Sequence, residues 1–194
     1  MAVDATKVLV GTPDQLTTGA ISSAALGTTL PTDAVTALDA AFADSGYVSS
    51  DGVKLTQDMS TSDINDWSGA LVRRVLEKFS GSISWSYIQA SAQEWKNSFG
   101  EDYVTVTPAT TNHGEQIAIR IGSRLPPAKS WAFNMKDGLT RIRIVCPNAQ
   151  VTSRDDMQFD ATDPISLPIT LSCYPDGQGN SIYIYVDDGL VAAA

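Results

Sequence analysis

The stretch WAFNMKDGLTRIRI, residues 131–144, decides how this chain folds. It contains Asp137-Gly138, and an Asp-Gly pair between two apolar runs is a strong hairpin signal, because a type I′ turn needs a positive φ at both central residues. Residues 139–144 alternate apolar and polar side chains, as a strand with one buried face does. We therefore predict a β-hairpin whose second strand turns one face to the core and displays Arg141 and Arg143 on the other.

Further strands are predicted on both sides of this hairpin. Runs of β-branched, aromatic or alternating residues between turn residues indicate strands. They occupy residues 47–50, 53–56, 83–87, 103–107, 117–121, 165–173 and 182–186. Asp51-Gly52 predicts a second hairpin between the first two of these strands, and residues 175–180 predict a turn between the last two. Many short strands favour a mainly β fold, a two-sheet sandwich or barrel.

Helix is scarce in the sequence. Residues 90–99 are the best candidate, with Ser91 as the N-cap, Glu94 as its capping-box partner three residues later and Gly100 as the C-terminal stop. We expect this helix to flank the sheets. A second, short helix is predicted at residues 34–42.

Residues 11–36 differ in composition from the rest of the chain. They are rich in Thr, Ser, Ala and Gly and contain no basic and no aromatic residue. Such a segment contributes little to a core, and its length within a compact domain suggests that a partner orders it. We expect one domain over residues 1–194, with residues 11–36 as an extended inter-subunit arm or loop.

Charge is distributed in blocks. The formal net charge is −9, which disfavours binding to nucleic acid phosphates. Residues 1–66 carry nine acids and two bases, residues 67–154 six acids and eleven bases, and residues 155–194 seven acids and no base. Such blocks suit head-to-tail contact between copies of the chain. Folding that mixes the blocks on one surface is the open alternative.

Composition also bears on the compartment. No apolar run approaches the ~18 residues of a membrane span, and no charged and apolar leader opens the chain. We expect no membrane span and synthesis in the host cytoplasm. The two cysteines, Cys146 and Cys173, are too few for a disulfide framework and are predicted to be buried thiols.

No arrangement of side chains predicts catalysis. The single histidine, His113, lies in a loop by composition, so a His-pair metal site is excluded and a catalytic triad would depend on this residue alone. Asp155-Asp156 and Asp187-Asp188 are poor acid pairs, because adjacent residues of a strand point to opposite faces. Residues 176–180 lack the repeated oxygen ligands of a calcium loop. We expect no enzyme activity, no cofactor and no metal.

Three motifs carry a resemblance to a known family. After the Thr/Ala-rich arm come FADSGYVSSDG at residues 42–52, DWSGALVR at 66–73 and FGEDYVTV at 99–106. Their order and spacing resemble the major tail proteins, or tail-tube proteins, of long non-contractile-tailed bacteriophages (siphophages), especially those infecting actinobacteria. The likeness covers most of the chain.

This resemblance implies a virion structural protein of the phage tail. It implies two packed β-sheets with one flanking helix, hexameric rings, and stacked rings that form a hollow tail tube through which DNA is ejected. The implied partners are further copies of the chain, the tape measure protein, and tail terminator and tip proteins. Genomic DNA would pass through the lumen without specific binding.

The resemblance also bears on residues 71–79. Their apolar positions 71, 72, 75, 76 and 79 have the spacing of a helix. The family implies a strand at this place, and packing context often overrides local pattern. We therefore predict a strand.

The predicted subunit interface combines arm, loop and strand residues. Trp67 lies in a loop and is the tryptophan best placed to meet a partner, whereas Trp85 and Trp131 lie in alternating strands and suit the core. The predicted interface residues are Leu16, Ile21, Leu26, Leu30, Asp51, Trp67, Arg73, Arg141 and Arg143.

Other functions remain open at this point. A monomeric carbohydrate-binding or adhesin-like β-sandwich module is the leading alternative and would present exposed aromatic side chains. An acid-dependent glycosidase is a more distant alternative. A tail terminator or connector of the same fold would form single rings.

Overall fold

The computed structural model describes residues 3–15 and 19–191. Strands make up most of its elements, so the predicted mainly β fold is confirmed. The strands are β1 (Thr12–Pro13), β2 (Ile21–Ala25), β3 (Ala43–Asp44), β4 (Lys54–Asn65), β5 (Leu71–Tyr87), β6 (Val104–Thr107), β7 (Gln116–Ile119), β8 (Lys129–Asp137), β9 (Thr140–Ser153), β10 (Leu167–Tyr174) and β11 (Tyr183–Asp187). The helices are α1 (Ala92–Phe99) and two 3-10 turns, η1 (Ala5–Lys7) and η2 (Glu101–Tyr103).

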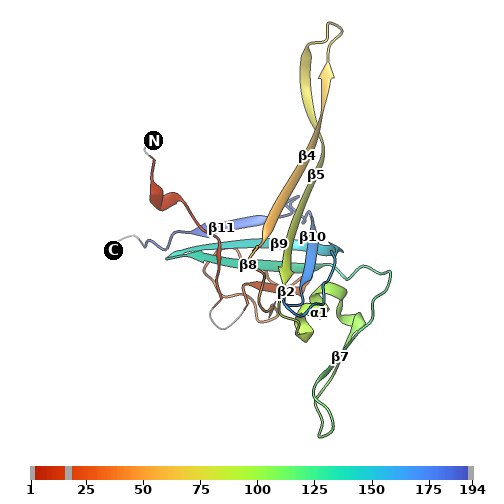
Figure 1. The fold of residues 1–194 in the computed structure, drawn as a ribbon. Coiled ribbons are helices and arrows are strands. Elements are labelled where there is room, and N and C mark those ends of the chain that lie inside the picture. Colours follow the sequence, from red (N-terminus) through yellow and green to blue (C-terminus); the bar gives the residue numbers. More distant parts are fainter. Residues whose placement is uncertain (1–2, 16–18, 192–194) are drawn as a thin grey trace.

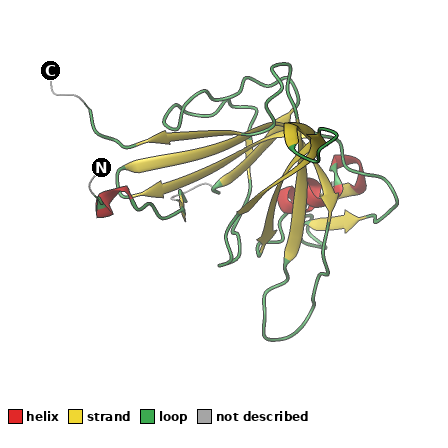
Figure 2. Cartoon of the chain, turned by 90° about the horizontal axis from the view of Figure 1, so that it is seen from above, coloured by secondary structure: helices red, strands yellow, loops and turns green. Residues whose placement is uncertain are grey.

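Nine strands form one antiparallel sheet, and β6 and β7 form a separate hairpin. The order along the large sheet is β3-β2-β8-β9-β10-β5-β4, with β1 also paired to β8 and β11 also paired to β9. Buried side chains of β2, β8, β9, β10 and β5 belong to a single apolar cluster. The sheet therefore curves around its core, and α1 lies beside β6 and β10 (Figures 1 and 2).

The hairpin predicted at residues 131–144 is the centre of this sheet. β8 and β9 pair along the whole of β8, and Asp137 stands opposite Thr140. The turn is thus Gly138-Leu139, and only Gly138 has a positive φ, 59°. A positive φ at the first turn residue alone is the type II′ pattern. The hairpin is confirmed, but the type I′ turn is wrong, because Asp137 is the last residue of β8.

The second Asp-Gly pair makes a turn but no hairpin. Gly52 has a φ of 69° and donates its N–H to the oxygen of Ser49 at 3.0 Å. The segments on both sides pair with β5 instead of with each other, since Val48 bridges Tyr87 and β4 runs along the rest of β5. The hairpin predicted across residues 47–56 is therefore wrong. At 17 residues, β5 is long enough to be the template for both segments.

β10 and β11 follow one another along the same edge of β9. Asp176 holds the predicted turn between them. Its Oδ1 accepts the N–H groups of Gln178 and Asn180 at 2.8 and 3.0 Å, and its Oδ2 accepts the Tyr183 hydroxyl at 2.6 Å. The Tyr183 hydroxyl, together with these N–H groups, lowers the pKa of the Asp176 carboxyl. Both carboxylate oxygens are therefore engaged in stabilising the turn.

Four aromatic side chains build the core. The Trp85 ring lies edge-on to Tyr87, Trp131 and Phe133, with centroids 5.6, 5.4 and 5.3 Å apart. None of the four is more than 5% exposed. Edge-to-face contacts of this kind stabilise beyond the area that they bury. The prediction that Trp85 and Trp131 fill the core is confirmed.

Cys146 of β9 and Cys173 of β10 lie in the same core. Both are free thiols, and their sulfur atoms are 3.6 Å apart. The contact with Cys173 and burial raise the pKa of the Cys146 thiol. The prediction of two buried thiols is confirmed.

α1 is capped at both ends as predicted. Glu94 Oε2 accepts the backbone N–H of Ser91 at 3.0 Å and also contacts the Ser91 hydroxyl. Gly100 follows the helix with a φ of 95° and donates its N–H to the oxygen of Lys96 at 2.9 Å.

The short helix predicted at residues 34–42 does not form. Arg143 of β9 donates to the backbone oxygens of Asp33 and Thr36 at 3.0 and 2.7 Å. In that helix the Asp33 oxygen would accept the N–H of Ala37 and the Thr36 oxygen that of Ala40. The segment forms turns instead, and Phe42, 8% exposed, packs on Ala132 of β8.

Part of the predicted arm belongs to the chain's own sheet. β2 pairs with β8 on one side and with β3 on the other, and Ile21 is 1% exposed in the main core. The expectation that residues 11–36 add little to the core is wrong for β2, because small side chains suit a strand that is covered on both faces. Deleting residues 11–36 would remove a sheet strand. An inter-subunit role for the rest of the segment stays a prediction.

Residues 71–79 form a strand, as predicted against their helical spacing. They are the distal part of β5, and two irregularities in its pairing with β4 leave Val72 and Glu77 without a partner. Such bulges insert an extra residue into a two-residue repeat. Side chains on one side of the strand therefore recur at 71, 74, 76 and 79, which imitates a helical period.

The aromatic core predicts a large loss of stability for one tryptophan substitution and almost none for another. Trp131→Ala should lower the free energy of unfolding by about 3–5 kcal/mol, because it leaves a cavity beside Trp85. Trp67 is fully exposed, so Trp67→Ala should change stability by less than about 0.5 kcal/mol. Urea denaturation of the monomer measures both. Equal effects would show that Trp131 is not part of the core described above.

Candidate functional site

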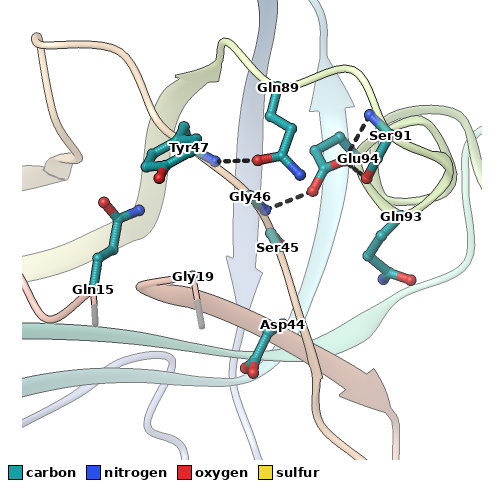
Figure 3. A pocket seen from close by; sticks show the side chains of 10 residues that line it. All are labelled: Gln15, Gly19, Asp44, Ser45, Gly46, Tyr47, Gln89, Ser91, Gln93 and Glu94. Carbon is teal, nitrogen blue, oxygen red and sulfur yellow. Dashed lines mark hydrogen bonds between the residues drawn. The ribbon is translucent and has the colours of Figure 1, made fainter. Parts of the chain in front are cut away.

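A polar pocket of about 400 Å³ lies between α1 and the segment before β4 (Figure 3). Glu94 is 1% exposed, and its Oε1 accepts the N–H of Gly46 at 2.6 Å while its Oε2 caps α1. Gln89 Oε1 accepts the N–H of Tyr47 at 3.3 Å. These hydrogen bonds join α1 and the residues just before it to the backbone at Gly46 and Tyr47.

A buried hydrogen-bond network near this pocket joins α1 to the sheet. Asn97 of α1 accepts the Ser23 hydroxyl at 2.9 Å and donates to the Ser45 hydroxyl at 3.0 Å. Ser45 also accepts the Tyr87 hydroxyl at 2.9 Å. Burial raises the pKa of Tyr87, so this hydroxyl stays protonated and remains a donor. The network therefore anchors α1, and it contains no nucleophile beside a base.

The titratable groups singled out in the sequence lie apart. His113 is in the β6–β7 loop, with its Nδ1 2.7 Å from the oxygen of Gly114. Asp155-Asp156 is exposed in the β9–β10 loop, and Asp187-Asp188 is at the end of β11. Within residues 3–15 and 19–191, no three His, Cys, Asp or Glu side chains are grouped to hold a metal ion. Over the same residues, no helix has the length and apolar character to cross a membrane.

The β4–β5 ribbon is the part of the fold that leaves the body of the molecule (Figure 1). β10 pairs with β5 only as far as Gly81, and beyond this residue the described chain adds no third strand to the ribbon. A two-stranded ribbon alone is at best marginally stable in water. This element is therefore expected to gain stability from contact with another molecule.

The core face of the sheet continues along one side of this ribbon. Directly paired residues of two antiparallel strands share a face. Going outward from the core, the pairs on this face are Leu55 with Ile83, Gln57 with Gly81, Met59 with Phe79, Thr61 with Leu76, Asp63 with Arg74 and Asn65 with Leu71. Asp63 and Arg74 form an ion pair between the apolar side chains of this face. Met59, Phe79, Leu76 and Leu71, which we call the ribbon row, are 65%, 45%, 56% and 54% exposed. An open apolar row of this kind marks an interaction surface.

Asp66 organises the tip of the ribbon. Its Oδ1 accepts the N–H groups of Ser68 and Ala70 at 2.9 and 2.8 Å, and Gly69 turns the chain with a φ of 83°. Hydrogen bonds, first that of the Ser68 hydroxyl, lower the pKa of the Asp66 carboxyl. The turn presents Trp67, which is fully exposed.

A second extension of the core face lies where β8, β9 and β11 run beyond the body (Figures 1 and 2). Ile142 of β9 pairs with Val186 of β11, and Ile144 pairs with Ile184. Ile144 belongs to the core, whereas Ile184 and Val186 are 51% and 57% exposed. We call Ile142, Ile184 and Val186 the wing face.

Some predicted interface residues make their contacts within the chain. Ile21 is in the core, and Arg143, 6% exposed, donates to Asn134 Oδ1 at 2.7 Å as well as to the 33–36 segment. Leu30 is half-buried in a small cluster with Phe42. Leu16 lies outside the described residues.

The other predicted interface residues are exposed at separate places. Trp67 and Arg73 share the ribbon, and Leu26 follows β2. Asp51 is in the turn before β4, and Arg141 of β9 lies 3.9 Å from an oxygen of Asp14. Of these exposed residues, Trp67 and Arg73 thus lie on one element, the β4–β5 ribbon. Their role in subunit contact stays a prediction.

Sequence reasoning missed most of the ribbon row and the wing face. Leu71, Leu76 and Phe79 were assigned to a strand, but a strand's apolar residues are expected in its own core by default. The length of the ribbon would have been a signal, but the strand predicted at residues 53–56 ends well before Asn65, where β4 ends. Ile184 and Val186 gave no such signal, since an alternating strand has one apolar face in any sheet.

These features define a class of protein: a mainly β protein with apolar strand surface that the described residues leave exposed. The sequence matches one protein family, phage tail tube protein, over residues 1–194. The chain belongs to this family.

Two solved structures are similar to the chain. The tube-terminating cap of the anti-feeding prophage is 17% identical, with a TM-score of 0.44, 96% of this chain and 100% of that chain covered. A chain of the sheath–tube complex of an extracellular contractile injection system in its extended state is 14% identical, with a TM-score of 0.38, 84% of this chain and 86% of that chain covered. A search of curated proteins gives no match.

The pocket predicts a stability effect for Glu94. Glu94→Ala should lower the free energy of unfolding by about 1–3 kcal/mol, because it leaves the part-buried N–H of Gly46 without its acceptor and removes the cap of α1. Lys96→Ala on the same helix is the control, since the Lys96 side chain makes no hydrogen bond in the described chain. Thermal melts compare the two. An unchanged midpoint for Glu94→Ala would contradict the anchoring role of this carboxylate.

Proposed function

We propose that this chain is the subunit of a phage tail tube, in which hexameric rings stack into a hollow cylinder that conducts genomic DNA into the host. The chain would be a virion protein of a long non-contractile tail, as its motif order suggests for siphophages of actinobacteria. Its partners would be further copies of itself, the tape measure protein, and terminator and tip proteins at the ends of the tube.

The ribbon row carries this proposal. Four apolar side chains continue the core face but stay about half exposed or more in the isolated chain. Their transfer from water to a protein contact is favourable by roughly 25 cal/mol per Å² of apolar surface. A monomeric binding module has no need of a ribbon that exposes apolar surface along its length, whereas a subunit of a polymer does.

The net charge suits a tube for DNA. At −9 per copy, the assembled wall would repel phosphates as a whole, and a conduit must let DNA slide without holding it. Two of the basic side chains near the body are engaged within the chain: Lys129 pairs with Glu101 at 2.9 Å, and Lys136 pairs with Asp14 at 2.9 Å. The lumen would therefore be a passive channel.

Shortening the ribbon tests the proposed assembly. Gln57 stands opposite Gly81, so residues 58–80 can be replaced by a short Asn-Gly turn while the body keeps its core. Wild-type protein should form rings or tubes with a central channel in negative-stain microscopy. The shortened variant should keep a cooperative melt but stay monomeric. Wild-type protein that stays monomeric at high concentration would overturn the proposed function.

The passive channel predicts weak binding of DNA. Duplex DNA should bind with a Kd above about 10 micromolar at physiological salt, because no dense Lys/Arg cluster releases counterions on the scale of a DNA-binding protein. Fluorescence anisotropy at several salt concentrations measures this affinity. Submicromolar binding with a steep salt dependence would contradict a passive lumen.

A further inference from the structure

We propose that the ribbon row of one copy packs on the wing face of the next copy. The inference rests on the proposed function and specifies which two surfaces meet. Both surfaces are extensions of the same core face of the same sheet, one beyond β5 and one beyond β9. Each therefore offers the apolar side chains that a core needs, and residues 3–15 and 19–191 leave both surfaces exposed.

The two surfaces match in chemistry. Leu71, Leu76 and Phe79 on the ribbon would meet Ile184 and Val186 on the wing, all of them 45% exposed or more. Packing them together gives a dry contact with branched aliphatic side chains on both sides and the Phe79 ring on the ribbon side, as the centre of a stable interface has.

One ion pair lies on the face that carries the ribbon row. Arg74 contacts Asp63 at 2.7 Å, so both charges already have a partner inside the ribbon. Arg73 and Lys78 stand opposite Ile64 and Ser60, on the other side of the ribbon. Among the directly paired residues of the row face, no charge is therefore left unpaired, which suits packing on the uncharged wing face.

Symmetry decides whether the ribbon row packs on the wing face or on the ribbon row of another copy. Two ribbon rows packed on each other would form an isologous contact, which closes at a dimer. A contact between two different surfaces is heterologous and can continue around a ring or along a filament. A subunit of a ring or tube therefore needs the ribbon to meet a different surface of its neighbour.

Two variants separate the surfaces. Leu76→Asp places a charge in the ribbon row and leaves the wing face intact. Val186→Asp places a charge in the wing face and leaves the ribbon row intact. Both positions are more than half exposed, so the monomers should fold, as thermal melts will show. Ser60→Asp, on the opposite side of the ribbon from the row, is the matched control and should assemble as the wild type does.

Mixing the variants gives the decisive result. Each variant alone should stay monomeric at a concentration at which the wild type assembles. An equimolar mixture should form a species of twice the monomer mass and nothing larger, because only one ribbon–wing contact is possible. Analytical ultracentrifugation measures these masses.

Two results would overturn the ribbon–wing contact without touching the proposed function. One is a mixture that remains monomeric while the wild type assembles. The other is assembly of either variant alone into the wild-type species. A dimer of Val186→Asp alone would indicate ribbon–ribbon packing. If the wild type also failed to assemble, the proposed function itself would be contradicted.

Discussion

One sheet has to supply both the core and the surfaces that extend from it. Its core face carries the aromatic cluster around Trp85 where β5, β8, β9 and β10 overlap. The same face runs on past this overlap in two directions, and there the described part of the chain adds no second layer to cover it. The burial of apolar surface stabilises the centre of the molecule, and the uncovered remainder drives association.

The central hairpin and the capped helix could be predicted from sequence because their signals are local. Gly138 allows a turn that few other residues adopt, and Glu94 caps α1 from three residues away. The exact turn type was not predictable, since a shift of one residue in register changes which residues occupy the turn. The strand at residues 71–79 could be predicted only from the resemblance to a family, because two bulges hide the two-residue period of its side chains.

Other features depend on contacts between distant residues and have no local signal. Arg143 donates to the carbonyl oxygen of Thr36 across 107 positions of sequence, in the segment where a helix was predicted and turns form instead. β2 has the composition of a loop, yet its small side chains suit a strand covered on both faces. For the candidate site, Trp67 was predicted as an interface residue because it lies in a loop. The ribbon row could be recognised only from the strand pairing, which shows that its residues lie on the core face of the sheet but outside the core.

Hydrogen exchange, compared between monomer and assembled protein, tests most directly whether the two extensions of the core face are the surfaces covered on assembly. The backbone amides of residues 57–79 and 183–187 should exchange quickly in the monomer, because these segments lack a packed layer. They should become strongly protected in the assembly, while the β6–β7 loop around His113 changes little. Unchanged exchange along the ribbon and β11 in fully assembled protein would contradict the account.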